Sequence, residues 1–321
     1  MIRGALLIAL AALLWATTGI VAKFLFTGTE LQATTLAFLR LAVALPFFWL
    51  LMRREQRHLQ KNANTDTKAP GSSLRQLDLK SLAPLAALGL FQAIYQGSYL
   101  LAVDLTGAGI ATLIALCLPP VLVAILAAPL LGEKPGLLTI MALITAVIGT
   151  AMLVLSDMDT NGTLRLAGIL MALLAALVYT GFTLTSRYSS TGTPVFTTAF
   201  ICFFTAALIL LPVVLLSGGF DGIENLELRH WLMVAFIGVV PTCIGYVSFF
   251  TGMKTTPATL SSIIVTLEPL FVALLAWIFL EEVLGPIGIA GALILTAAVI
   301  VASRYGGKSG AAPKNDPNTS A

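Results

Sequence analysis

The sequence is poor in charged residues and contains very little histidine and cysteine. Only 10% of its 321 residues are Asp, Glu, Lys or Arg, against roughly 25% in a soluble chain. Hydrophobic residues make up 58%, and the mean hydropathy is +0.97. A soluble globule could not cover so much apolar surface with so few charges. The composition therefore excludes a soluble globular protein and indicates that lipid is the solvent for most of the chain.

The missing residue patterns exclude several kinds of site. Cys117, Cys202 and Cys243 are isolated in apolar runs, so we interpret them as small hydrophobic fillers and expect no disulfides. His58 and His230 have no partners at metal-ligand spacing, so no metal site is expected. Because the chain has no Gly-rich phosphate loop and no Ser/His/Asp arrangement, we expect neither ATP-driven pumping, enzymatic activity nor a cofactor.

Ten apolar stretches are long enough to cross a bilayer, since a helical span needs about 20 residues. This pattern predicts an all-α integral membrane protein. The predicted spans are 4–26, 31–52, 81–103, 107–131, 135–155, 166–187, 194–216, 231–252, 257–280 and 284–304. The connection 53–80 and the tail 305–321 are polar, and we expect both to be solvated and poorly ordered.

The ten spans divide into two similar halves. Trp15 and Lys23 in the first span are matched by Tyr179 and Arg187 in the sixth, an aromatic and a cation at the same spacing. Because five spans is an odd number, the second half must enter the membrane upside down relative to the first. We therefore expect two inverted five-helix repeats around a central cavity, an architecture typical of secondary transporters. The expected domains are 1–156, 157–304 and a disordered cytoplasmic tail, 305–321.

Lysine and arginine are unevenly divided between the two membrane faces that this topology defines. If the N-terminus is inside, only Lys23, Arg165 and Arg229 lie outside, Arg40 lies within a span, and all the others lie inside. Cytoplasmic loops carry the excess of positive charge in membrane proteins. Both termini are therefore predicted to be cytoplasmic.

Arg40 and Glu268 are ionisable residues near the middle of predicted spans. Each costs roughly 2.5–3.5 kcal/mol at that depth unless it meets a partner or water. Two interpretations remain open. In the first, the two side chains pair with each other, or each is satisfied by nearby hydroxyls and carbonyls. In the second, they hold a charged substrate directly or carry a proton during transport. Glu268 is the better candidate for a proton carrier, because burial favours the neutral form of a carboxyl group.

Gln92, Tyr95, Gln96 and Tyr99 recur at spacings of three and four and so share one face of the third span. Amide and phenol groups that face lipid would lack hydrogen-bond partners, so this face should contact protein or water. It is either a set of interhelical hydrogen bonds or a cavity wall for a small polar solute. Tyr246 in the eighth span is the approximate repeat partner of Tyr95.

Other repeat-equivalent residues have two interpretations each. Trp15 and Tyr179 are too deep for an interfacial belt, so they are either core residues or apolar walls of the cavity. Lys23 and Arg187 are either snorkelling anchors or residues at the mouths of a transport path.

Pro120 and Pro269 interrupt corresponding spans of the two halves. Each is either a static kink or a hinge that shapes the central cavity. Paired interruptions of this kind point toward the binding region in transporters built from repeats.

These landmarks together resemble a known group of transporters. The residues that carry the resemblance are Leu-Leu-Trp15, Phe38-Leu-Arg40 and Leu-Glu268-Pro269-Leu, with Glu282 at the end of the same span. Over nearly all of 4–304 the chain resembles the ten-span, EamA-type members of the drug/metabolite transporter superfamily. The resemblance implies a basket-like bundle with a central cavity lined by spans one, three, four, six, eight and nine, and with spans five and ten at the periphery.

The resemblance also implies a function. It implies a multi-pass secondary transporter of the bacterial inner membrane that moves small polar metabolites by alternating access, with amino acid export as the expected activity. A lipid-linked sugar flippase or a membrane-embedded enzyme subunit is the alternative. The expected partners are a small-molecule substrate, the lipid bilayer and protons as coupling ion, in a monomer or homodimer that binds no nucleic acid.

Tags fused to the two ends of the chain test the predicted topology. Both tags should be accessible in inside-out vesicles and protected in intact spheroplasts, because ten crossings return the chain to the side where it began. Protease protection and immunoblotting of each tag measure this. Tags found on opposite faces would contradict an even number of spans.

Overall fold

The computed structural model describes residues 2–65, 79–106, 108–156, 166–190, 192–221, 223–280 and 285–305. Within these ranges the chain is helical almost throughout and has no β-strand. The helices are α1 (Ile2–Thr27), α2 (Ala33–Thr65), α3 (Leu79–Thr106), α4 (Ala108–Leu131), α5 (Leu137–Ser156), α6 (Leu166–Ser190), α7 (Val195–Leu216), the 3₁₀ turn η2 (Ile223–Asn225), α8 (Leu228–Ile237), the π-helix η3 (Gly238–Gly245), α9 (Tyr246–Met253), α10 (Ala258–Val265), α11 (Glu268–Leu280) and α12 (Pro286–Tyr305). By length and composition, 10 helical stretches of the described chain can span a membrane, which confirms the predicted fold class.

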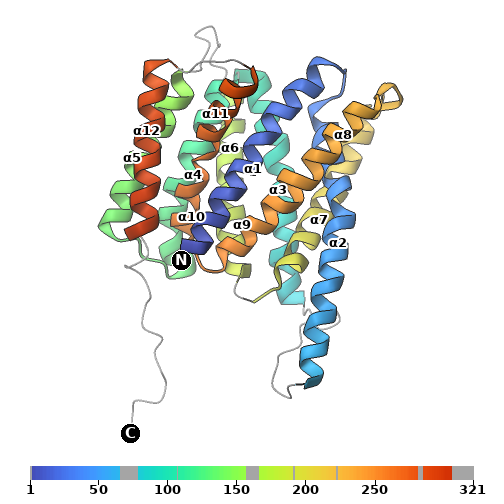
Figure 1. The fold of residues 1–321 in the computed structure, drawn as a ribbon, viewed down its shortest axis with the longest axis horizontal. Helices are drawn as coiled ribbons and strands as arrows, with labels where there is room; N and C mark the ends of the chain where they lie inside the picture. Colours follow the sequence, from blue (N-terminus) through green and yellow to red (C-terminus); the bar gives the residue numbers. More distant parts are fainter. Residues whose placement is uncertain are drawn as a thin grey trace.

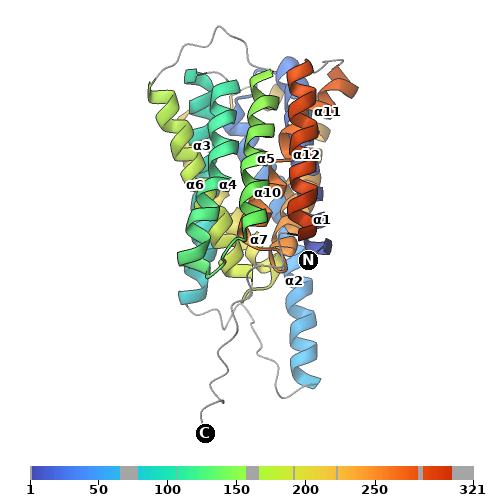
Figure 2. The same ribbon diagram turned by 90° about the vertical axis from the view of Figure 1, so that its left-hand side faces the viewer.

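The described chain begins and ends at the same end of the bundle. α1 starts there and α12 finishes there, while α2 extends past the other helices on that side (Figures 1 and 2). This extension differs from the expectation of a poorly ordered loop over 53–80, because helix α2 continues to Thr65. Its polar part is rich in Arg, Glu, Gln and Lys, which favour the helix even outside the apolar span.

The strongest packing joins helices from different halves of the chain. α5 packs along α12 and α2 along α7, so matching spans of the two halves meet. α3 packs against α6, and the equivalent contact after exchange of the two halves is that of α9 with α1. Likewise, α4 packs against α6, and the equivalent helices of the second half, α10 and α11, pack against α1. Exchanging the two halves therefore maps each contact onto another, as expected of two related five-helix units.

The α5–α12 pair lies at one edge of the bundle and depends on glycine (Figure 1). A Cβ atom on Gly149 would lie 2.7 Å from the backbone nitrogen of Leu295, and one on Gly291 would lie 2.7 Å from the carbonyl oxygen of Gly149. The two backbones can approach this closely only because neither residue has a side chain. Small residues serve the same purpose wherever membrane helices pack without a hydrophobic driving force.

The ninth predicted span is broken in two near its middle. α10 ends at Val265, a turn covers Thr266 and Leu267, and α11 begins at Glu268. Pro269 has no N–H to continue the hydrogen-bond ladder, and a residue that precedes proline disfavours the α conformation. The sequence predicted an interruption here, and the structure shows that it separates two helices.

The eighth predicted span is also irregular, because a π-helix separates α8 from α9. Pro241 lies inside it and cannot donate to the carbonyl of Ile237, four residues earlier. The hydroxyl of Thr242 donates to that carbonyl instead, at 2.8 Å. Because a π-helix pairs groups five residues apart, the Ile237 carbonyl does not depend on Pro241, and the Thr242 hydroxyl adds a hydrogen bond to it.

Substitution of the contact glycines tests the α5–α12 packing. Gly149→Ala and Gly291→Ala should each destabilise the detergent-purified protein by roughly 1–3 kcal/mol, because each new Cβ meets backbone that cannot rotate away. Thermal unfolding measures the effect. Gly19→Ala is the matched control, since nothing lies within 4 Å of a Cβ at Gly19. Equal melting temperatures for all three variants would contradict the close contact.

Candidate functional site

Tyr246, the first residue of α9, lies where three spans meet inside the bundle. Gln92 of α3 is 2% exposed, and its Nε2 donates to the Tyr246 hydroxyl at 2.9 Å. The indole ring of Trp15, from α1, lies 4.7 Å from the Tyr246 ring. Gly245 makes room for this indole, because a Cβ there would lie 2.9 Å from the Trp15 Nε1. The phenol of Tyr246 is therefore held by two spans of the first half.

Three further tyrosine and threonine contacts form an aromatic wall beside Tyr246. Tyr95 stacks on Tyr99 with ring centroids 5.8 Å apart, and Tyr179 of α6 lies 5.4 Å from Tyr95. The Tyr99 hydroxyl is 2.8 Å from the Oγ1 of Thr112 on α4. All four side chains are partly accessible rather than fully buried. These contacts join α3 to α6 through Tyr179 and to α4 through Thr112.

Glu268 carries the negative charge of this cluster. It is the first residue of α11, so the break in the ninth span places its carboxyl group at a helix N-terminus inside the bundle. Helix N-termini stabilise negative charge. The carboxyl group interacts electrostatically with the phenols of Tyr95, Tyr99, Tyr179 and Tyr246.

Arg40, from α2, carries the positive charge of the cluster. Its guanidinium group interacts electrostatically with Glu268 and with Tyr246. The two charges nevertheless form no ion pair, which would require nitrogen and oxygen within 4.0 Å. In the described part of the chain, ion pairs join Arg187 to Glu133 and Arg229 to Glu227 instead. A direct Arg40–Glu268 ion pair, one of the two sequence interpretations, is absent from this conformation.

Two donors in this cluster are buried without an acceptor. The Arg40 Nε and the Trp15 Nε1 are shielded from solvent, and neither has a hydrogen-bond partner among the described residues. A buried unsatisfied donor is costly, about 1–3 kcal/mol. The arrangement can therefore bind an anionic or strongly accepting group on the Arg40 side, and a cationic or donating group beside Glu268.

The remaining predicted residues lie at different distances from this cluster. Lys23 is exposed near the end of α1, and Arg187 lies near the end of α6. Pro120 is buried within the unbroken helix α4, whereas Pro269 follows Glu268 directly. Gln96 is half-buried on α3, on the same helical face as Tyr95 and Tyr99, and donates no hydrogen bond to a described side chain.

Sequence reasoning missed Thr112 as a residue of the site, and the structure also gives the contacts of Glu133. Thr112 had no signal in its apolar span, and only its contact with Tyr99 identifies it. Glu133, which follows the fourth span, caps a helix and pairs with a base: it accepts from the Ala258 backbone N–H at 2.7 Å and from the Arg187 Nε at 2.8 Å. Its repeat partner Glu282 lies outside the described residues.

The Gln92–Tyr246 hydrogen bond gives a stability prediction. Tyr246→Phe removes the acceptor of the buried Gln92 amide and should lower the free energy of unfolding by about 1–3 kcal/mol. Tyr179→Phe is the matched control, because the Tyr179 ring makes aromatic contacts but its hydroxyl bonds to no described side chain. Thermal unfolding in detergent compares the two, and equal losses would show that the hydrogen bond is not what stabilises this site.

Known proteins share both the sequence and the fold. The profile of the EamA-like transporter family matches residues 2–155 and 166–304. "Uncharacterized transporter YwfM" of Bacillus subtilis is 32% identical over 233 residues, which cover 70% of this chain and 77% of that protein. "Uncharacterized inner membrane transporter YicL" of Salmonella typhimurium is 23% identical over 309 residues, which cover 94% and 95%.

A solved crystal structure of another protein superposes on this chain with a TM-score of 0.66, over 95% of this chain and 98% of that protein's chain. The two sequences are 20% identical, so this similarity concerns the fold alone. The family profile, by contrast, covers both halves of the sequence, including the spans that carry Arg40 and Glu268. This chain therefore belongs to the EamA-like transporter family, whose members are multi-pass membrane transporters rather than enzymes.

Proposed function

We propose that this chain is a secondary transporter of the bacterial inner membrane that exports amino acids or related small metabolites. Its two inverted halves alternate access to one central site, with both chain termini in the cytoplasm. One observation carries the proposal. Arg40 from the first half and Glu268 from the second face the same interior cluster with opposite charges and without an ion pair. Unpaired opposite charges suit a substrate that bears both charges itself.

The Arg40 side of the site suits a carboxylate. A carboxylate oxygen can accept from the Arg40 Nε, a buried donor without a partner among the described residues. Hydrogen bonds between a guanidinium and a carboxylate are charge-assisted and roughly twice as strong as neutral ones. Binding would therefore remove the cost of the unsatisfied Arg40 donor.

The Glu268 side of the site suits a protonated amine. A carboxylate inside the bundle can accept hydrogen bonds from an ammonium group, and aromatic faces attract cations. Tyr95 and Tyr179 supply such faces close to Glu268. The same carboxylate binds either an ammonium group or a proton, and this competition would couple substrate export to proton entry.

The broken helices support the proposed location of the site. Discontinuous spans form substrate sites near the midplane in many secondary transporters. Here the break at Thr266 and Leu267 positions Glu268, and the π-helix Gly238–Gly245 ends directly before Tyr246. Both irregular spans lie in the second half, while Arg40, Trp15 and Gln92 come from the first. The site is thus divided between the halves, as alternating access requires.

The first step of the test identifies a ligand. The purified protein is heated with each of the twenty amino acids, with matching amines that lack the carboxylate, and with matching acids that lack the amine. A ligand at about 100 times its Kd stabilises the folded state by about 2.7 kcal/mol. Stabilisation by an intact amino acid but by neither truncated analogue supports recognition of both charges. Stabilisation by polyprenyl-linked sugars alone would favour the flippase alternative.

Transport by Glu268→Gln then tests the mechanism. In proteoliposomes with a pH gradient, the variant should lose gradient-driven accumulation of the radiolabelled amino acid but keep exchange across the membrane, because Gln cannot carry a proton. Arg40→Gln should lose both activities, since it removes the carboxylate partner. Glu30→Gln, at an exposed carboxylate, is the control. Wild-type proton-driven accumulation by Glu268→Gln would remove that residue from the coupling mechanism.

A further inference from the structure

Three layers of side chains follow one another along α6 and α9 toward the end of the bundle that carries the termini. Tyr179 and Tyr246 belong to the central cluster described above. About one turn further along each helix lie phenylalanines, and after a second turn lie Arg187 on α6 and the last residues of α9. The distance from Tyr179 to Arg187 along the helix is about 12 Å. The second and third layers therefore separate the central cluster from that membrane face.

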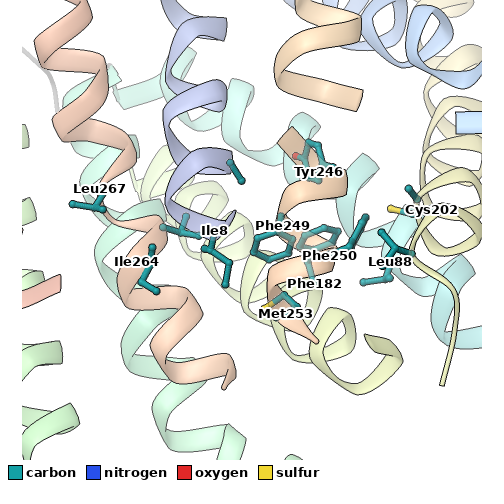
Figure 3. Packing of buried hydrophobic residues seen from close by; sticks show 14 of the residues in the cluster. Ile8, Leu88, Phe182, Cys202, Tyr246, Phe249, Phe250, Met253, Ile264 and Leu267 are labelled. Carbon is teal, nitrogen blue, oxygen red and sulfur yellow. The ribbon is translucent and has the colours of Figure 1, made fainter. Parts of the chain in front are cut away.

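The second layer is a dry aromatic plug made of Phe182, Phe249, Phe250 and Met253. Each of these side chains is at most 3% exposed. Phe182 of α6 lies 6.0 Å from Phe249 and 6.1 Å from Phe250 of α9, measured between ring centroids. Figure 3 shows the three rings side by side below Tyr246, with Met253 beneath them. Tyr179 in the first layer is partly accessible, whereas these four side chains exclude solvent.

The third layer is a polar network centred on Arg187. The Arg187 Nε donates to Glu133 at 2.8 Å, and its Nη1 donates to the carbonyl oxygens of Met253 at 2.6 Å and Lys254 at 3.1 Å. The other oxygen of Glu133 accepts from the backbone N–H of Ala258, in the first turn of α10, at 2.7 Å. Two side chains therefore tie together the ends of α4, α6 and α9 and the start of α10.

We propose that the aromatic plug and the Arg187 network together form the inner gate of the transporter, closed in this structure. Glu133 belongs to the first half of the chain, whereas Arg187, Met253, Lys254 and Ala258 belong to the second. Movement of the first half against the second at this face separates Glu133 from Arg187 and from the Ala258 backbone, which breaks the network. The proposal rests on the proposed alternating access, but its test requires no substrate.

The hydrogen bonds of the Arg187 network can break and form again at low cost. Arg187 and Glu133 keep 21% and 15% of their side-chain surface exposed, so water reaches them when they part. Their remaining partners are backbone groups at helix ends, where a cation near a C-terminus and a carboxylate near an N-terminus are each favourable. Those backbone groups can return to water without unfolding the helices.

The plug is suited to the same movement, because it contains no hydrogen bond between side chains of α6 and α9 in the described structure. Its rings contact one another by stacked, tilted and edge contacts. Aromatic contacts of this kind contribute about 0.5–1.5 kcal/mol each beyond burial. These contacts can therefore exclude water from the path when the rings are packed, and they can separate without breaking a hydrogen bond between side chains.

A second contact at the same end of the bundle supplies a matched control. Glu55 of α2 accepts from the backbone N–H of Thr197, in the first turn of α7, at 3.2 Å. Glu55 and Glu133 both belong to the first half, and each accepts from a backbone N–H in the first turn of a helix of the second half. The N-cap residue of that helix is a proline in both cases, Pro194 for α7 and Pro257 for α10. Unlike Glu133, Glu55 makes no hydrogen bond to Arg187 and lies on the α2–α7 pair; its charge acts on the Lys254 side chain, whereas Arg187 uses the Lys254 backbone carbonyl.

The experiment measures solvent access just behind the network. Ser186 of α6 is 1% exposed and lies between Phe182 and Arg187, so Ser186→Cys is a nearly isosteric reporter. It is placed in a chain with Cys117→Ala, Cys202→Ala and Cys243→Ala. A charged, membrane-impermeant methanethiosulfonate is applied to vesicles on the face that carries the termini, and the labelling rate is divided by total reactivity after denaturation.

Opening the inner gate should expose this thiol. Glu133→Gln and Arg187→Gln should each raise the labelling rate roughly tenfold or more, as expected for loss of a charge-assisted contact. Glu133→Gln retains an oxygen that can cap α10, so it stays informative if Arg187→Gln does not fold. Glu55→Gln should leave the rate unchanged. Unchanged rates in both network variants, or equal acceleration in Glu55→Gln, would overturn the proposal.

Discussion

Two unpaired charges inside an apolar bundle are the constraint on which the rest of this structure depends. Arg40 and Glu268 lie in membrane spans, where an ionisable side chain must find a partner, water or a ligand. The bundle surrounds them with phenols, an amide and an indole from α1, α3, α6 and α9 and holds them short of contact. This arrangement keeps the two side chains inside the bundle without a direct ion pair between them.

Irregular backbone brings these groups to one place. A regular helix across the ninth span would leave Glu268 in a continuous hydrogen-bond ladder, whereas the break makes it the first residue of α11. In the eighth span, the π-helix pairs groups five residues apart around Pro241, and the Thr242 hydroxyl donates to the Ile237 carbonyl as well. Departures from regular helix are tolerated at membrane depth only where such groups are satisfied or line an interior space.

The sequence predicted more of the composition of the site than of its contacts. Arg40 and Glu268 stood out because charges are rare at membrane depth, and Tyr95 and Tyr99 because their spacing puts them on one helical face. The bond between Gln92 and Tyr246 could not be predicted, because it joins residues far apart in the chain. The same holds for Thr112, whose partner defines its role. Arg187 had two interpretations, and its network with Glu133 and two carbonyls argues against a simple snorkelling anchor.

The sequence by itself determined that the chain is embedded in a lipid bilayer and how many helices can cross that bilayer. It also determined which ionisable residues cost free energy at membrane depth. These properties are local, because hydropathy and helical periodicity are read along a single segment. Only the tertiary structure decided which side chains meet, because that depends on how each helix is rotated and how closely it approaches its neighbours. Contacts between the halves, such as the close approach of Gly149 to Gly291, set those rotations, and no segment carries them alone.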